Sequence, residues 1–159
     1  MGEFVEYIMQ IKISNYLDIN LVSFLKSKSR DGVISQMIDS LDNFKNLPDK
    51  ELFKEAILKR ENIVSTGIGM GVAIPHAKLS FFSQFFIAIG IQKAKALEWD
   101  SLDGSLVRLI FMIGGPENKQ NEYLQILSHL TLIIKDEKLR KKLTNSSSKE
   151  EVVKLLLNY

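Results

Sequence analysis

The sequence predicts a single α/β domain of three layers, in which a mixed β-sheet carries helices on both faces. Two continuous apolar runs, 85–91 and 106–113, have the composition of strands that are covered on both faces. Segments whose apolar residues recur at helical spacing lie before and after these runs. Strands and helices in alternation along 159 residues are typical of one layered domain.

The first half of the chain is predicted to contain one strand and two helices. Residues 21–25 form a short apolar run after a polar turn, as expected of a strand. A helical pattern follows over 29–44, with Ser29 or Asp31 as its cap. Pro48 is expected to open a second helix. The apolar face of this second helix is expected at Leu52, Phe53, Ala56 and Ile57. The helix is expected to end at 59–61.

The second half is predicted to continue with two strands and then helices. The apolar run 106–113 is broken only by Arg108, and the Gly-Gly-Pro sequence at 114–116 is expected to stop it. A long helix is predicted over 117–134. Two shorter helices are expected near 136–143 and 148–157, the second with a capping box formed by Ser148 and Glu151.

The composition argues against several classes of protein. The chain has 21 basic and 19 acidic residues, so it lacks the excess positive charge of a nucleic-acid binder. It has no cysteine, which excludes disulfides and thiolate metal sites and fits a reducing cytoplasm. No apolar run approaches the roughly 20 residues that span a membrane. We therefore expect a cytoplasmic protein that neither binds nucleic acid nor inserts into a membrane.

The domain itself is expected to occupy residues 13–159, after an N-terminal extension at 1–12. The chain start has no basic region followed by an apolar one, so it is not a signal peptide. Met9 is an alternative start, and residues 1–8 are either native or a remnant of cloning.

The stretch from Ser65 to Lys78 is the most informative part of the chain. It places three glycines at alternate positions, then a short apolar segment, then Pro75 and His76. Glycine allows positive φ or a close approach, and proline restrains its own φ and the preceding residue. His76 is one of only two histidines. We interpret the stretch as a device that holds one imidazole at the end of a strand, where α/β sheets build their sites.

Other known motifs do not fit this stretch. A dinucleotide-binding fingerprint would need its third glycine at position 72, where Val72 stands. The chain has no Walker A sequence and no Gly-x-Ser-x-Gly elbow. The two histidines show no metal-ligand spacing. We therefore expect neither a metal nor a cofactor.

The Ser65–Lys78 stretch resembles the signature of the fructose/mannitol-type IIA domain of the bacterial phosphoenolpyruvate-dependent phosphotransferase system (PTS). The nitrogen-regulatory IIA branch is the most similar. The resemblance runs from about Ile13 to Leu157 and includes 59–61 and the turn at 99–104. It implies that His76 accepts a phosphoryl group from the phosphocarrier protein HPr or its nitrogen-branch counterpart. His76 would then pass the group to a IIB partner or keep it as a regulatory mark.

The resemblance also implies phosphate-binding roles for Arg60, Thr66, Gly67 and Tyr123. Arg60 precedes His76 at the spacing of the family's phosphate-contacting arginine, although a cation at a helix C-terminus is an alternative reading. Backbone N–H groups of the glycine stretch would face the phosphate. Tyr123 stands where the family commonly has a second histidine, and it offers one O–H donor instead.

Two functions stay open at this stage. The first is a phosphocarrier, and whether such a protein counts as an enzyme is left undecided. The alternative is a regulatory binding module of the nitrogen type, which controls a kinase or a transporter with little onward transfer.

Three further features have open or structural interpretations: His129 as a structural residue, Phe81 and Phe82 as core or docking surface, and 135–142 as a solvated helix face or a docking patch.

Overall fold

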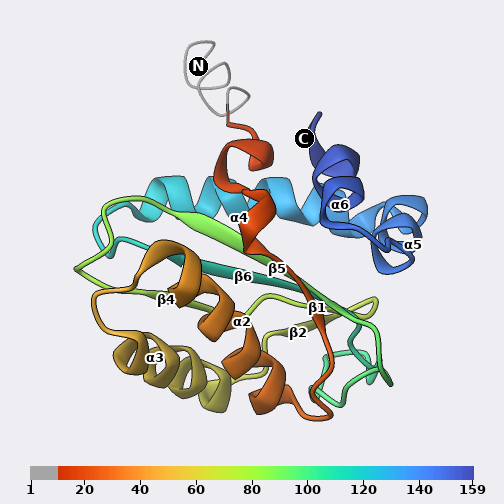
Figure 1. Cartoon of the computed structure of the whole chain (residues 1–159), viewed down its shortest axis with the longest axis horizontal. Helices are drawn as coiled ribbons and strands as arrows, with labels where there is room; N and C mark the ends of the chain where they lie inside the picture. The colour runs from red at the N-terminus through yellow and green to blue at the C-terminus, as the bar shows by residue number, and fades with distance from the viewer. Residues whose placement is uncertain (1–10) are drawn as a thin grey trace.

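The computed structural model describes residues 11–159, so the proposed extension at 1–12 lies outside the described residues except for its last two. One sheet forms the middle of the molecule (Figure 1). Its six strands are β1 (Val22–Leu25), β2 (Gly67–Gly69), β3 (Val72–Ala73), β4 (His76–Lys78), β5 (Phe86–Gln92) and β6 (Leu109–Gly115).

The sheet is mixed, as the sequence predicted. The strand order is β1-β5-β6-β3-β2, and β4 pairs with β6 farther along the edge that β3 uses. β1 runs parallel to β5, β3 and β4 run parallel to β6, and the other pairings are antiparallel. The chain therefore pairs with β6 twice along one edge. His76 begins the second pairing, opposite Ile113, so the prediction that it lies at the end of a strand is wrong.

Helices cover both faces of the sheet, which confirms the three-layer prediction (Figure 1). α2 and α3 lie on one face, and α4, α5 and α6 lie on the other with the first of two short 3-10 helices, whereas Leu21 of the second 3-10 helix belongs to the core under α2 and α3. The bounds are η1 (Ile13–Tyr16), η2 (Ile19–Leu21), α2 (Arg30–Lys45), α3 (Lys50–Ile63), α4 (Gln120–Lys135), α5 (Glu137–Thr144) and α6 (Lys149–Leu156).

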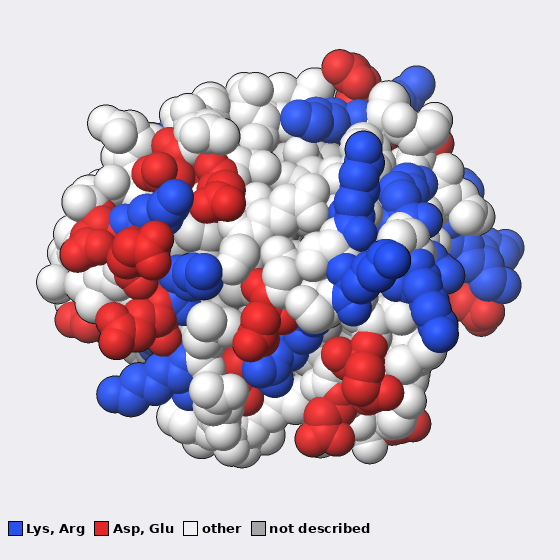
Figure 2. Space-filling model, turned by 60° about the horizontal axis from the view of Figure 1, so that its bottom comes forward, with Lys and Arg blue, Asp and Glu red and all other residues white. Residues whose placement is uncertain are grey.

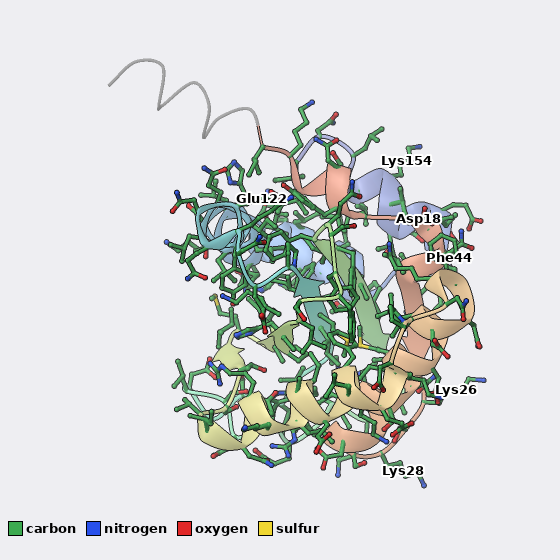
Figure 3. All side chains as sticks on the ribbon, turned by 90° about the vertical axis from the view of Figure 1, so that its left-hand side faces the viewer. Asp18, Lys26, Lys28, Phe44, Glu122 and Lys154 are labelled. Atoms are coloured by element: carbon green, nitrogen blue, oxygen red, sulfur yellow. The ribbon has the colours of Figure 1, made fainter. Side chains whose placement is uncertain are left out.

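Side-chain alternation along the central strands produces two separate cores. Ile87 and Ile89 of β5 join the core under α4, whereas Ala88 joins the core under α2 and α3. Every residue of β5 and β6 is buried. Figure 3 shows side chains filling the space between the layers, while the exposed Lys26 and Lys28 project outward.

The observed bounds of α2 and α3 differ in part from the predicted bounds. Ser29 caps α2, and its side chain accepts a hydrogen bond from the backbone N–H of Gly32 (3.0 Å). α3 begins after Asp49, which caps it, so Pro48 lies outside the helix. Leu52 is 42% exposed and does not belong to the buried face of α3. The helix also continues to Ile63, two residues beyond the predicted end.

The strand and helix bounds around residue 115 differ from the sequence prediction as well. β6 begins at Leu109 and includes both glycines that were expected to stop it. Both glycines pair with the neighbouring strands, and a side chain at either position would clash with the rings of Phe86 and Phe85, which fill the space where the Cβ atoms would stand. α4 begins only at Gln120, after a turn that follows the strand.

Candidate functional site

The Ser65–Lys78 stretch folds as a tight hairpin followed by a strand. Gly69 (φ 103°) and Gly71 (φ 77°) flank Met70, which also has positive φ, so the reversal between β2 and β3 requires backbone that glycine supplies without strain. The backbone N–H of Met70 donates to Asp103 (2.9 Å). The hairpin tip is thereby tied to the turn that precedes β6.

His76 is half-buried, and its ring has a fixed orientation. Its Nδ1 lies 2.9 Å from the carbonyl oxygen of Ile74, so Nδ1 carries the proton in the neutral ring and Nε2 has the free lone pair. Burial lowers the pKa of His76 below its ordinary value, and the nearby charges of Arg60 and Lys78 lower this pKa further. The backbone contact with Ile74 and the charge of Glu61 act on the pKa in the opposite direction.

Arg60 lies in the last turn of α3, and its charge acts on both His76 and Tyr123. Its Nη1 donates to the backbone carbonyl of Val64 (2.7 Å), just past the helix end. This bond fixes one arm of the guanidinium, while no carboxylate of residues 11–159 forms an ion pair with it. Arg60 therefore caps the helix end, and its charge acts on His76, while its phosphate-binding role stays a prediction.

Glu61 is a charged residue to which the sequence pattern assigned no role. It is only 3% exposed. One carboxylate oxygen accepts bonds from the hydroxyl of Thr66 (2.5 Å) and the indole N–H of Trp99 (2.7 Å). The other accepts from the backbone N–H of Thr66 (2.6 Å). The buried carboxylate joins α3, the start of β2 and the turn before β6 into one unit behind the site.

Tyr123 lies beside His76, as the resemblance implied for the position of a second histidine. The two ring centroids are 5.6 Å apart. The Nζ of Lys78 stands 4.4 Å from the centre of the Tyr123 ring and also donates to Gln120 (2.5 Å). Burial raises the pKa of Tyr123, and the charge of Arg60 partly offsets this rise, so the phenol keeps its proton at neutral pH. Lys78 is a second cation near His76, and no sequence motif singled it out.

Thr66 and Gly67, the other two predicted phosphate ligands, have protein partners in this structure. Both donors of Thr66 bind the carboxylate of Glu61. The N–H of Gly67 donates to the hydroxyl of Ser65 (3.0 Å). Thr66 is tied to the segment that leads to His76 because its carbonyl accepts from the N–H of Ile74 (3.0 Å). The phosphate-binding role of both residues stays a prediction, and it requires each donor to leave or share its present acceptor.

His129 is not part of this group. One of its ring nitrogens lies 2.8 Å from the carbonyl oxygen of Gln125, one turn earlier in α4. Among residues 11–159, no cluster of three or more His, Asp or Glu side chains is arranged to hold a metal ion. The same residues include no helix with the length and apolar character needed to cross a membrane.

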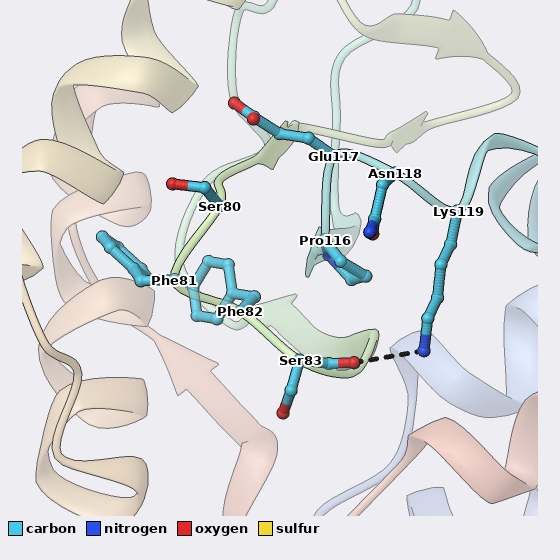
Figure 4. A pocket seen from close by; sticks show the side chains of 8 residues that line it. All are labelled: Ser80, Phe81, Phe82, Ser83, Pro116, Glu117, Asn118 and Lys119. Atoms are coloured by element: carbon cyan, nitrogen blue, oxygen red, sulfur yellow. Dashed lines mark hydrogen bonds between the residues drawn. The ribbon is translucent and has the colours of Figure 1, made fainter.

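A hollow of about 510 Å³ lies beyond the end of β4 (Figure 4). Phe81 and Phe82 line one side, and the segment 116–119 lines the other. Lys119 closes one end by donating to the backbone carbonyl of Ser83 (3.3 Å). Phe82 also packs against the core under α2 and α3, so it is both core and pocket wall, whereas Phe81 contacts the ring of Phe82.

A comparison with protein families identifies the family of the chain. The family model for "Phosphoenolpyruvate-dependent sugar phosphotransferase system, EIIA 2" matches residues 15–159. The chain belongs to this family. It is an EIIA-type phosphocarrier of the PTS, as the resemblance implied.

Individual relatives fall in both the sugar and the nitrogen branches. The chain is 37% identical over 147 residues to the fructose-specific EIIABC component of Bacillus subtilis, covering 92% of this chain but only 23% of that protein. It is 31% identical to the fructose-specific EIIA component of Haloferax volcanii, covering 91% and 94% of the two chains. The structure of nitrogen regulatory protein IIA-Ntr from Neisseria meningitidis superimposes with a TM-score of 0.83 at 30% identity, covering 91% and 98%. The EIIA relatives therefore include both carriers named for a sugar and a protein named for nitrogen regulation.

Proposed function

We propose that His76 is the residue that receives the phosphoryl group, and that it does so through Nε2. The main support for this proposal is the contact between its Nδ1 and the carbonyl of Ile74, which leaves Nε2 as the nucleophilic nitrogen. A lowered pKa supports the same role because a neutral imidazole is the form that attacks phosphorus. In the transfer, a bond forms between Nε2 and phosphorus while the bond between phosphorus and the donor breaks.

Charge around His76 supports phosphate binding by Arg60, Lys78 and Tyr123. Phosphoryl transfer depends mainly on positioning and on neutralising the charge of the phosphoryl oxygens. Arg60 offers the guanidinium arm that Val64 does not hold, and Lys78 adds a second cation. Tyr123 contributes one hydroxyl donor. Thr66 and Gly67 complete the proposed set through their backbone N–H groups, once phosphate replaces their present acceptors.

The proposed donor is HPr or its nitrogen-branch counterpart, and the proposed acceptor is a IIB component. Family membership supports both partners at the level of class. The Escherichia coli mannitol IIA, which shares this fold at 18% identity and a TM-score of 0.74, has been solved in complex with a phosphorylated IIB enzyme. A cytoplasmic location is part of the same proposal.

Phosphate transfer from phosphoenolpyruvate tests this function. The protein is incubated with labelled phosphoenolpyruvate, enzyme I and HPr, and the acid-labile label is mapped. We expect label on His76 and none in His76→Ala. His129→Ala is the matched control, because it removes the other histidine and should be labelled normally. Equal labelling of His76→Ala would overturn the assignment.

Regulation is a second candidate, and it is favoured by the structural similarity to nitrogen regulatory protein IIA-Ntr. In this case the phosphorylation state of His76 changes binding to a kinase or a transporter. Exposed apolar side chains near Arg60 and Tyr123 in the sequence, Ile63, Val64 and Leu124, are suited to a protein partner. Capture of partners by the wild type, His76→Ala and His76→Asp tests it. Identical capture by all three proteins would exclude a phosphorylation switch.

A further inference from the structure

A second hollow, of about 260 Å³, lies at the hairpin tip, away from His76. It is bounded by the β2–β3 turn, the start of β6 and one side of α5. Val72 lies four residues before His76 along the same edge of β6, a separation of roughly 13 Å at the rise of an extended strand. The hollow is therefore distinct from the proposed phosphorylation site.

Two arginines on this hollow are held in place but have no carboxylate partner within ion-pair distance in the described part of the chain. The Nη1 of Arg108 donates to the backbone carbonyls of Gln92 (3.3 Å) and Ala94 (3.0 Å). The Nη1 of Arg140 donates to the carbonyl of Ile134. Within residues 11–159, neither guanidinium forms an ion pair. Each arginine is thus oriented through one nitrogen, and its other N–H groups are available to an oxygen ligand.

The surrounding charge is strongly positive. Lys141 also lines the hollow, and its ion pair with Glu137 (3.1 Å) balances the one acidic side chain of the lining. Arg140 also lowers the pKa of Glu137, but less than Lys141 does. Figure 2 shows Lys and Arg side chains gathered on the side of the molecule where α5 lies in Figure 1. The lining therefore keeps a net excess of two positive charges, which the guanidinium groups of Arg108 and Arg140 supply.

The rest of the lining is apolar and partly exposed. Met70 is 46% exposed and Leu106 is 44% exposed, and both border this hollow with Val72. A ligand that suits the site would combine a doubly charged anionic group with a short carbon chain, the body of the ligand, that covers these side chains. The volume is suited to a small metabolite and is below that of most drug-sized pockets.

We infer that this hollow binds a small phosphate monoester, with its dianionic phosphate between the guanidinium groups of Arg108 and Arg140. Phosphate oxygens accept the paired N–H groups of a guanidinium in a planar fork, and two such forks match a charge of about −2. The body of the ligand lies against Met70 and Leu106. The site does not depend on phosphorylation of His76, so its test is separate from the test of the proposed function.

Calorimetric titration of the unphosphorylated protein with glycerol 3-phosphate, at fixed ionic strength, tests the inference. We expect saturable binding of one equivalent and affinity at least about tenfold lower in Arg108→Gln and in Arg140→Gln. Arg108→Lys keeps the charge but loses the fork, so it is also expected to bind more weakly. Arg108 is exposed, so its variants should fold even if Arg140→Gln does not, and thermal unfolding is recorded for each.

Two matched variants distinguish this site from general surface charge and from the phosphorylation site. Lys142→Gln removes an exposed cation of α5 that does not line the hollow, and His76→Ala removes the proposed phosphorylation site. Both should bind glycerol 3-phosphate as the wild type does. A loss in Lys142→Gln equal to that in Arg108→Gln would mean general surface attraction, and a loss in His76→Ala would place the anion at the phosphorylation site. Either result overturns the inference.

Two further probes test the ligand class. Inorganic phosphate should compete with glycerol 3-phosphate but bind more weakly, because it lacks a body to cover Met70 and Leu106. Succinate, a dianion without the tetrahedral phosphate, should also bind more weakly. Absence of saturable binding by glycerol 3-phosphate, or tighter binding of succinate, would overturn the assignment to phosphate monoesters.

Discussion

His76 owes its chemistry to one backbone contact and to its burial. The contact between Nδ1 and Ile74 selects the tautomer, and burial favours the neutral ring. Neither feature could be derived from the sequence, although the Pro75-His76 pair indicated a restrained histidine. The carbonyl that selects the tautomer belongs to the residue before the proline, and only the path of the chain brings it to the ring.

The pH dependence of His76 follows from its lowered pKa. We expect its imidazole to titrate below the usual value of about 6.5, as measured by NMR of the ring protons. The rate of phosphoryl acceptance should therefore stay constant as the pH falls through 6.5 and should decline only near the lowered pKa. The contribution of His76 to the free energy of unfolding should fall between about pH 6.5 and that lowered pKa, because the unfolded chain binds the proton first. A titration midpoint above about 6.5 would contradict this prediction.

Arg60 is expected to act on the transition state. Arg60→Gln removes the charge near His76 and should slow phosphoryl acceptance by roughly a hundredfold, in line with the loss of one electrostatic donor. The same change removes a cation that lowers the pKa of His76, so this pKa should rise. Single-turnover transfer from phosphorylated HPr measures the first effect. Lys59→Gln, which removes the neighbouring exposed cation, is the control and should transfer at nearly the wild-type rate.

At the scale of elements, the buried carboxylate of Glu61 joins parts of the chain that the sequence pattern left separate. Three donors from Thr66 and Trp99 converge on it. The resemblance included both Glu61 and Trp99 but gave no physical reason for their presence. A charged residue near a helix end is usually solvated, so the residue type alone could not predict a buried acceptor 38 residues away in sequence from the indole.

Replacing Glu61 tests this connection. Glu61→Gln keeps the size of the side chain but leaves one acceptor oxygen for three donors, so at least one donor loses its partner. We expect a loss of about 1.5–3 kcal/mol in the free energy of unfolding, measured by denaturant titration. Glu55→Gln, at an exposed position of the same helix, is the matched control and should leave stability nearly unchanged. Equal stability of the two variants would contradict the role of the buried carboxylate.

The central strands were predictable from sequence, and the hairpin strands were not. The apolar run at 85–91 coincides with a strand whose residues are all buried, because continuous hydrophobicity directly reflects covering on both faces. The stretch 67–78 instead divides into three short strands. That division depends on two separate pairings with β6, which local patterns do not encode. The hollow between Arg108 and α5 was equally beyond prediction, because it is formed by segments distant in sequence.

At the scale of the whole molecule, residues near the two ends of the described chain lie together. The backbone N–H of Ser14 donates to the carbonyl of Tyr159 (3.0 Å), and Ile13 is fully buried in the core under α4. Ile13 is the first core side chain of the described residues, and the domain start proposed at residue 13 stays a prediction. The match to the family model begins two residues later, at residue 15.

Two shortened chains test that bound. A chain that begins at residue 11 should unfold at the same denaturant midpoint as the full chain, because it retains Ile13 and Ser14. A chain that begins at residue 17 loses the Ile13 side chain and should be less stable by about 2–5 kcal/mol, the cost of emptying a buried aliphatic site. Denaturant titration of the three proteins measures both. Equal stability of all three would place the start of the domain after residue 16.

The position of Trp99 has a practical consequence. It is the only tryptophan of the chain, it is almost fully buried, and its indole N–H contacts the carboxylate that also holds Thr66. Indole emission responds to the charge and polarity of its surroundings, so the molecule contains a natural fluorophore that shares a hydrogen-bond acceptor with the loop before His76. Phosphate arrival that displaces Thr66 from Glu61 would change the light emitted by Trp99, and the transfer could be followed in real time without any added dye.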